Sequence, residues 1–177
     1  ATGPLAAAAA GDILLLQNET SHQAAAARAG RAAGMRVIYS AAPFEAASVK
    51  AVLGLATILV MNRGESEALV RELGTALGDL PVEGVLVTMG GAGAGYHDVK
   101  HGHFIAVPAF PVAPVDTTGA GDTFTGYFAA GLDQGLGLDA AMRLASAAAA
   151  VKVTRAGAAD AIPDRAETDA FLRKHHG

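Results

Sequence analysis

The residues best suited to chemistry lie in one stretch, Val115–Gly126, which reads VDTTGAGDTFTG. Its small residues Gly119, Ala120 and Gly121 stand where an extended segment is expected to turn into a helix, so backbone N–H groups can approach an anion closely. Because a helix start adds positive potential, a phosphate group is the expected ligand. A carboxylate is a strange choice for an anion site whose only task is binding. Asp122 is therefore interpreted as a base that accepts a proton from a hydroxyl group attacking the phosphate.

The elements that must position this stretch begin with four short apolar runs. They lack polar alternation, as expected of strands buried on both faces of a parallel sheet. The runs are Ile13–Gln17, Arg36–Ser40, Thr57–Met61 and Gly84–Met89. Segments with helical character separate them: Ser21–Ala33, which opens with a capping-type Ser and ends at Gly34, then Phe44–Leu53 and Glu65–Leu77. This alternation predicts βαβ units with right-handed crossovers.

After Met89 the pattern changes. Gly95–Val99 and His103–Val107 are short, β-prone and separated by Lys-His-Gly, which predicts a hairpin. Three prolines then lead an extended segment into Asp116, and helices are expected over 120–134, 138–155 and 166–174. The predicted fold class is α/β, a three-layer α-β-α Rossmann-like domain whose largely parallel sheet has an antiparallel edge. No repeat or linker divides the chain.

Composition narrows the function classes. Of the 177 residues, 51% are hydrophobic and 17% charged, with a net charge of −4 and no cysteine. This is enough apolar material for a packed core, and no basic face for nucleic acid is visible. The lack of Cys excludes disulfides and thiolate metal sites and favours a reducing cytoplasm. No apolar run reaches the roughly 20 residues that cross a bilayer, and a signal peptide is not expected from the start ATGPLAAAAAGD.

The 116–126 string resembles the second signature of the PfkB/ribokinase family, DTxGAGDxFxG, at nearly every position. The alternative interpretation is an ordinary Gly-rich turn between a strand and a helix. The length of the match, which includes both aspartates, disfavours this alternative. Four further segments resemble family motifs in the family's order: LLLQNE at 14–19, NRGE at 62–65, TMGGAG at 88–93 and AAAAVKVTRAGA at 147–158.

The resemblance implies an ATP-dependent carbohydrate kinase of ribokinase-like fold that uses Mg²⁺. It implies that Glu19 contacts the sugar, that Asn62 lies near the phosphates and that Glu65 organises Mg²⁺ through water. By the same resemblance the nucleotide is bound by Thr88, Gly90, Gly91, Gly93 and Ser146. The main chain at Lys152, Arg155 and Gly157, with Asp116 and Thr118, would hold K⁺.

Departures from the family pattern also count. Tyr39–Pro43 reads YSAAP where ribokinases have NPAP, and Ala161 occupies the place of a Ser that contributes to the K⁺ site in some members. The resemblance begins partway into the family's pattern, without its first strands, glycine-pair motif and lid. Residues 1–177 are therefore expected to form one nucleotide-binding domain that is incomplete at its N-terminal side.

The predicted function is transfer of the γ-phosphoryl group of ATP to a sugar hydroxyl, with ribose or a related sugar as acceptor. The expected partners are this small sugar and ATP, without nucleic acid or membrane, and with a homodimer left open. The fragment alone is expected to be inactive. One alternative is a truncated, non-catalytic nucleotide-binding or interaction domain. A dinucleotide-binding Rossmann domain is a poorer alternative, because no G-x-G-x-x-G follows the first strand.

Several of these residues also have simpler readings. Glu19 alone could be a helix N-terminal carboxylate, and N-x-x-E alone is more often a helix cap. His101 and His103 could share a hairpin face and bind a metal, but two histidines on an exposed turn are more often solvated. His175 and His176 are expected to belong to a frayed tail.

Overall fold

The computed structural model describes residues 4–175, which form two compact units. Unit 1 comprises the described residues up to Val87 together with Tyr96–Phe104, and unit 2 comprises Thr88–Gly95 together with the described residues from Ile105 onward. His176 lies outside the described residues, whereas His175 is the last residue of a helix.

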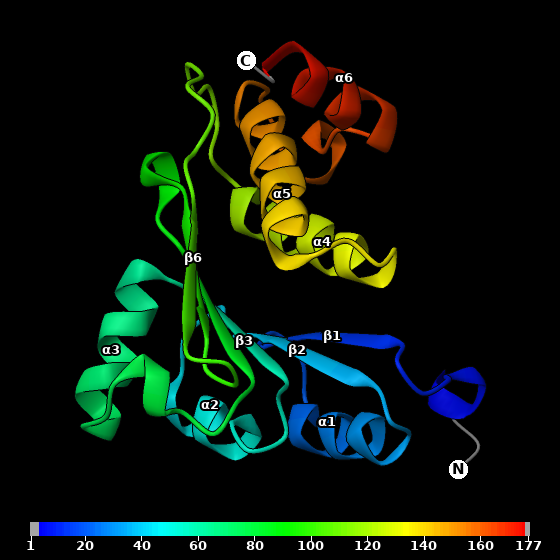
Figure 1. The fold of residues 1–177 in the computed structure, drawn as a ribbon, viewed down its shortest axis with the longest axis vertical. Coiled ribbons are helices and arrows are strands. Elements are labelled where there is room, and N and C mark those ends of the chain that lie inside the picture. Colours follow the sequence, from blue (N-terminus) through cyan, green and yellow to red (C-terminus); the bar gives the residue numbers. More distant parts are fainter. Residues whose placement is uncertain (1–3, 176–177) are drawn as a thin grey trace. The chain divides into compact units, whose positions relative to one another are not determined.

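A six-stranded sheet runs through most of unit 1, with its strands in the order of the chain (Figure 1). Strands β1 and β2 pair in parallel with Ile13 opposite Arg36, and β2 and β3 pair in parallel with Ile38 opposite Ile58. The strands are β1 (Ile13–Gln17), β2 (Arg36–Ser40), β3 (Ile58–Asn62), β4 (Gly84–Thr88), β5 (Ala94–Asp98) and β6 (His103–Val107). The predicted α/β class with a mostly parallel sheet is confirmed.

Burial explains why the central strands lack alternation. Val37, Ile38 and Leu59 are fully buried, as are Val85 and Leu86 in β4. Consecutive side chains point to opposite faces of a strand, so both faces of β2 and β4 are covered. β1 differs, because its residues are only half-buried and Leu15 is 41% exposed.

The helices of unit 1 are α1 (Gln23–Ala32), α2 (Ala46–Val52) and α3 (Arg63–Leu73), with short 3₁₀ turns at Pro4–Ala7 and Leu77–Asp79. Figure 1 shows α1 and α2 on the same side of β1–β3. The helix expected from Ser21 starts later, because His22 takes a left-handed conformation as N-cap with φ 66° and no side-chain cap bond forms. The helix expected to reach Leu77 stops at Leu73, because Gly74 turns left-handed with φ 65°.

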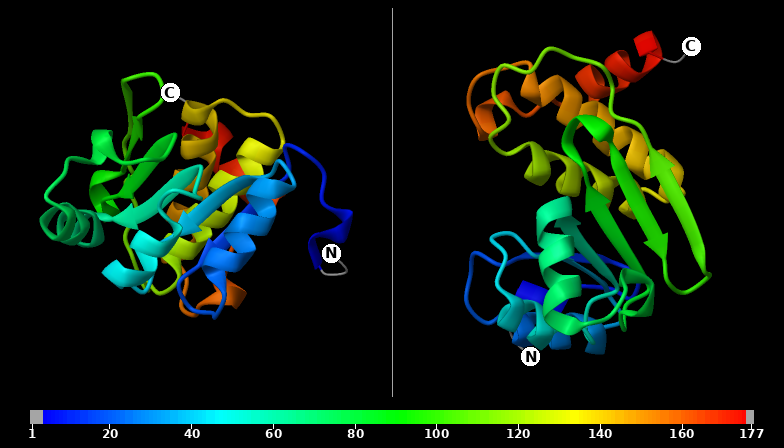
Figure 2. Two further views of the ribbon diagram at one scale, coloured as in Figure 1. Left: turned by 90° about the horizontal axis from the view of Figure 1, so that it is seen from below. Right: turned by 90° about the vertical axis from the view of Figure 1, so that its left-hand side faces the viewer.

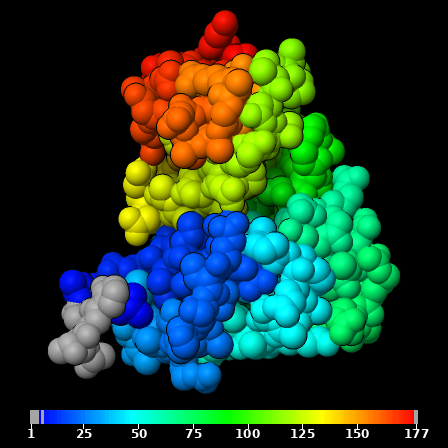
Figure 3. Space-filling model, turned by 180° about the vertical axis from the view of Figure 1, so that it is seen from behind, coloured from blue at the N-terminus to red at the C-terminus, as the bar shows by residue number. Residues whose placement is uncertain are grey.

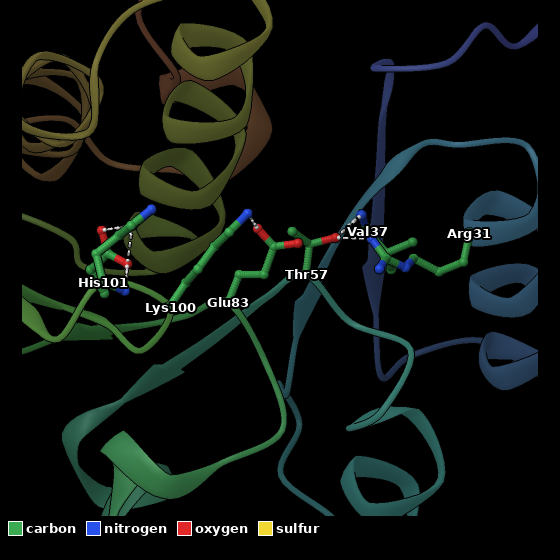
Figure 4. A network of polar contacts seen from close by, with 7 residues as sticks. Arg31, Val37, Thr57, Glu83, Lys100 and His101 are labelled. Atoms are coloured by element: carbon green, nitrogen blue, oxygen red, sulfur yellow. Dashed lines mark hydrogen bonds and ion pairs between the residues drawn. The ribbon is translucent and has the colours of Figure 1, made fainter.

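Thr57 ties α1 to the sheet from a buried position just before β3 (Figure 4). Its hydroxyl oxygen accepts hydrogen bonds from Arg31 Nη1 at 3.1 Å and from the Val37 backbone N–H at 3.0 Å. The backbone N–H of Thr57 also donates to the Val37 carbonyl at 2.7 Å. One hydroxyl group thus satisfies the buried amide of Val37 and also binds the guanidinium group of the exposed Arg31.

β5 and β6 form the expected hairpin, and the right-hand view of Figure 2 shows the two strands side by side. The turn is closed by a hydrogen bond from the Gly102 N–H to the Asp98 carbonyl at 2.8 Å. At its base, Lys100 Nζ lies 3.1 Å from Glu83 Oε2 (Figure 4). Gly84 has no room for a side chain, because a Cβ there would lie 1.8 Å from the Tyr96 hydroxyl.

Unit 2 is helical. α4 (Ala120–Asp133) packs on α5 (Leu138–Val153), and Gly131 permits this approach since a Cβ there would meet the Ala141 Cβ at 3.1 Å. α6 (Arg165–His175) follows α5. Unit 2 also contains short 3₁₀ turns at Gly90–Ala92 and Ala159–Ala161. All three predicted helices exist. Among residues 4–175, no helix has both the length and the apolar character that a membrane span requires.

Candidate functional site

A pocket of about 110 Å³ lies within unit 2 at the start of α4. Six of its lining residues come from motifs that the sequence singled out: Thr88, Gly90, Gly93, Ala120, Gly121 and Ser146. Two more, Ala109 and Phe124, were not predicted. Motifs separated by more than fifty residues in the sequence, at 88–93 and at 146, therefore meet around one cavity.

The first turn of α4 forms one wall of this pocket, which Ala120 and Gly121 line. Gly119 is the N-cap with φ 71°, and no side chain caps the helix there. The first N–H groups of a helix have no partner inside the helix, and that of Ala120 donates instead to the Thr117 carbonyl at 3.1 Å. A Cβ on Gly121 would meet nothing within 4 Å. The carboxylate of Asp122 is exposed and follows in the same turn.

The loop after β4 is shaped by glycine. The Met89 N–H donates to the Gly93 carbonyl at 2.8 Å, and Gly90 and Gly93 adopt positive φ angles of 56° and 95°. A Cβ on Gly93 would lie 2.1 Å from the Val107 carbonyl oxygen, so the loop can pass this strand only with glycine. Gly90 and Gly91 have open space beside them.

An apolar pocket of about 380 Å³ adjoins the first and shares Gly90, Ala109, Ala120 and Ser146 with it. Ser146 is buried, and its hydroxyl donates to the Pro108 carbonyl at 3.3 Å. The other lining residues are Gly91, Phe110, Pro111, Val112, Pro114, Thr117, Ala149, Ala150 and Val153. A small cavity at a helix start beside a larger apolar volume suits a ligand with one anionic and one flat apolar part.

The apolar wall at 110–114 was not predicted as part of the site. This proline-rich segment has no helical or strand period, so the sequence showed only an extended connection. Its partners Ala149 and Val153 looked like core positions of an Ala-rich helix. The available signal was the run of three prolines itself, which keeps the segment extended along α5.

Asp116, just before α4, sits in a network of backbone donors. Its Oδ1 accepts from the Thr118 N–H at 2.9 Å and its Oδ2 from the Gly157 N–H at 3.0 Å. Hydrogen bonds from the backbone and side chain of Thr118, then that from Gly157, lower the pKa of Asp116 to about 2, and the charge of Lys152 adds to this. The carboxylate is therefore ionised at any physiological pH.

The remaining predicted K⁺ residues follow α5. The Lys152 side chain is fully buried, and its Nζ donates to the Asp116 carbonyl at 3.0 Å. The Arg155 guanidinium instead pairs with Glu167 at 2.8 Å, while its backbone N–H donates to the Lys152 carbonyl at 3.1 Å.

Unit 1 holds the other predicted site residues. Asn62 and Glu65 form a capping box at the start of α3: Asn62 Oδ1 accepts from the Glu65 N–H at 2.9 Å, and Glu65 Oε2 accepts from the Asn62 N–H at 2.7 Å. The simple reading of N-x-x-E as a helix cap is thus realised. Glu19 is exposed in the turn that follows β1.

The hairpin histidines are not gathered into a metal site. His101 Nδ1 lies 2.9 Å from Asp98 Oδ1, and His103 is exposed. Within the described part of the chain, no three His, Cys, Asp or Glu side chains come together in a way that could hold a metal ion.

Comparisons with known proteins agree with the motifs. Residues 5–165 match the family model described as pfkB family carbohydrate kinase. A ribokinase from Haemophilus influenzae is 34% identical over 91% of this chain and 56% of its own. Among solved structures, an Arabidopsis thaliana ribokinase complexed with ribose and ATP is 30% identical with a TM-score of 0.77, covering 91% of this chain and 55% of its own.

An E. coli structure of a ribokinase II candidate, in complex with ATP and Mg²⁺, is 25% identical with a TM-score of 0.78 and covers 92% of this chain and 59% of its own. The chain thus spans about half the length of the curated relatives it matches.

Proposed function

Because the chain belongs to the pfkB family of carbohydrate kinases, we propose that it carries the nucleotide-binding part of an ATP-dependent sugar kinase. The acceptor would be a hydroxyl group of ribose or a related sugar. The Haemophilus influenzae relative is named as a ribokinase, and the Arabidopsis thaliana structure holds ribose and ATP.

The observation that carries this proposal is the paired cavity of unit 2. Its smaller part meets the first turn of α4, and its larger part is lined by Phe110, Pro111, Val112 and Pro114. A nucleotide has the matching chemistry, a flat apolar base and an anionic chain. The base would lie among these apolar residues and Ser146, and the phosphates against the amides of Gly119, Ala120 and Gly121.

Asp122 would act as the base. Its carboxylate is exposed in the first turn of α4, where it can accept a proton from an incoming sugar hydroxyl. The amides before it would stabilise the negative charge that gathers on the transferred group. Bound ATP would supply the phosphoryl group, and Mg²⁺ would offset the negative charge of its phosphates. Thr88, Gly90, Gly91 and Gly93 would shape the nucleotide loop.

Glu65 and Glu19 have roles in the proposal that rest on the resemblance. Glu65 would organise Mg²⁺ through water, a task that hard carboxylate oxygens suit. The capping bond uses Oε2 of Glu65, and a carboxylate has a second oxygen. Asn62 would lie near the phosphates, and Glu19 would contact the sugar. Residues 1–177 are proposed as one nucleotide-binding domain that is incomplete at its N-terminal side, and the cytoplasmic location remains a prediction.

The test of the phosphate site is Gly121→Val. A Cβ at Gly121 meets no neighbour within 4 Å, so the variant should fold, while its branched side chain blocks the approach to the helix amides. Calorimetric titration of ATP and Mg²⁺ into the intact protein is expected to show affinity weakened by about tenfold or more. Gly126→Val is the matched control, since Gly126 lies in the same helix, has open space and lines neither pocket. Equal affinities of the two variants would remove this loop from the phosphate site.

A non-catalytic nucleotide-binding or interaction domain is the second candidate. It is favoured by one observation, that Asn62 and Glu65 already bond to each other in a helix cap. ADP production by the intact protein, of verified mass, against a panel of sugars separates the two. Sugar-dependent turnover supports the kinase, and nucleotide binding without turnover on any sugar supports the second candidate.

A further inference from the structure

The ammonium group of Lys152 is buried away from the two pockets described above. Lys152 lies in the last turn of α5 with 0% of its surface exposed, and it lines neither of these two pockets. Its Nζ donates to the backbone carbonyl of Asp116 at 3.0 Å. Lysine is almost never fully buried, because an ammonium group loses its hydration there. The free-energy cost of burying this charge suggests that the ammonium group has a specific role.

The segment that this ammonium holds leads directly into the phosphate-binding turn. The N–H groups of Val115 and Asp116 both donate to the Val153 carbonyl, at 2.7 and 3.1 Å. The Asp116 carboxylate is bonded to the N–H of Gly157. The end of α5 and the residues that follow it therefore fix the 115–118 segment from three points. Residues 154–160 lie at the surface (orange in Figure 3), whereas the side chain of Lys152 is buried.

The same backbone is where the family resemblance implies K⁺, and the residues present do not fit that ion. The Asp116 carbonyl already accepts from the ammonium, and the Lys152 carbonyl accepts from the Arg155 N–H at 3.1 Å. An ion in contact with the Asp116 carbonyl would lie within about 6 Å of the ammonium, and repulsion at that range weakens binding by about a hundredfold at an effective dielectric constant near 20. Ala161 is buried and has a methyl group where some members of the family have a serine hydroxyl group.

We propose that the Lys152 ammonium is a built-in substitute for a monovalent cation, which positions the 115–118 segment and thereby the start of α4. Lys152 is a positioning residue: it acts through Asp116 and touches neither nucleotide nor sugar. The consequence is that nucleotide binding by this protein needs no K⁺. This inference rests on the proposed function only where it concerns the nucleotide, because the effect on folding stands without one.

The experiment measures thermal unfolding and ATP affinity of the intact protein in KCl and in choline chloride at equal ionic strength. The wild type is expected to give the same unfolding midpoint and the same affinity in both salts. Lys152→Ala leaves a space beside the Asp116 carbonyl oxygen, so its midpoint and affinity should fall in choline chloride and rise in KCl or ammonium chloride, as cation binding to the folded state requires. A merely structural lysine would give a loss that no cation repairs.

Lys50→Ala is the control, because Lys50 is 45% exposed and pairs with Glu72 at the surface, so this variant should not respond to the cation. If Lys152→Ala does not fold, Lys152→Met keeps the buried stem without the charge and should bind ATP about tenfold more weakly than the wild type. Wild-type affinity or stability that rises with K⁺ overturns the inference, as does unchanged affinity of Lys152→Met. Absence of ATP binding in every salt refutes the proposed function instead, and the unfolding midpoints still decide the inference.

Discussion

Asp122 and Asp139 occupy equivalent places on neighbouring helices, the first turns of α4 and α5, and both are exposed. Only Asp122 adjoins residues that line the pocket. Asp122→Asn is therefore expected to lower the kcat of the active, full-length enzyme by about 10²–10⁴ through loss of the base, with ATP affinity within a few-fold because the amides remain. Steady-state ADP production and calorimetric titration measure the two quantities.

Asp139→Asn is the control for that substitution, because it removes the same charge from the first turn of the neighbouring helix. It should keep the wild-type kcat. An Asp122→Asn enzyme that retains most of its turnover would show that Asp122 is not the base.

Asp116 gives the protein an acid-dependent contribution to stability. Hydrogen bonds from Thr118, and then from Gly157, lower its pKa to about 2, against about 3.9 in an unfolded chain. A lowered pKa stabilises the fold above the unfolded value, and this stabilisation is lost as the pH falls from about 4 to about 2. Urea unfolding should show that the wild type is more stable than Asp116→Asn at pH values above about 5. The difference in the free energy of unfolding should shrink as the pH falls from about 4 to about 2. A difference independent of pH would contradict this role.

At the scale of the element, one hydroxyl group connects α1, β2 and β3. Thr57→Val keeps the shape but leaves Arg31 and the Val37 N–H without their acceptor. The free energy of unfolding is expected to fall by about 1–3 kcal/mol, the cost of leaving such donors unsatisfied. Chemical denaturation measures it. Thr57→Ser retains the hydroxyl and should lose much less, and equal losses from the two substitutions would assign the effect to packing alone.

Strands were easier to predict than helix ends. The apolar runs at 13–17 and 36–40 match β1 and β2 residue for residue. In β2 the reason is burial on both faces, which favours an apolar residue at nearly every position, whereas β1 is only half-buried. The start of α1 depends on a left-handed His22, which no hydrophobic period reveals. The end of α3 was available in principle, since Gly74 is a common C-terminal residue, but apolar residues beyond it extended the period.

The candidate site, too, could be predicted from the sequence only in part. The motifs at 88–93 and 119–122 predicted the smaller pocket, because their glycines and carboxylate form a long pattern that an ordinary turn does not need. The larger pocket depends on Phe110–Pro114 lying along α5, a tertiary contact between two segments that each look unremarkable in the sequence. The ammonium of Lys152 was missed for a similar reason, since the resemblance concerned only its main chain.

For the molecule as a whole, the isolated 177-residue polypeptide is expected to bind ATP weakly and to show no sugar-dependent ADP production. The nucleotide residues are present, whereas the predicted sugar side is represented by Glu19 alone. Phosphoryl transfer relies on alignment, which can supply roughly 7–11 kcal/mol of barrier reduction. A coupled assay with a panel of sugars, on protein of verified mass, tests this. Robust turnover would place the substrate site elsewhere in the chain.

The same polypeptide should self-associate. β1 is an outer strand of the sheet and exposes 41% of Leu15, so its edge can pair with another chain. Light scattering across a concentration series is expected to show a rising mean mass. Leu15→Lys should suppress the rise, and a monomer at all concentrations would be the contrary result.

The order of the strands also bears on biosynthesis. Neighbours in the sheet are neighbours in the chain from β1 to β6. A ribosome synthesises a chain from its N-terminus at about 5–20 residues per second. Each strand after β1 therefore appears when the preceding strand, which is its partner in the sheet, has already been made. Pairing then requires only the closure of short intervening segments, which costs little entropy. The last strand ends at Val107, so all six strands have been synthesised before the first residue of α4 is translated.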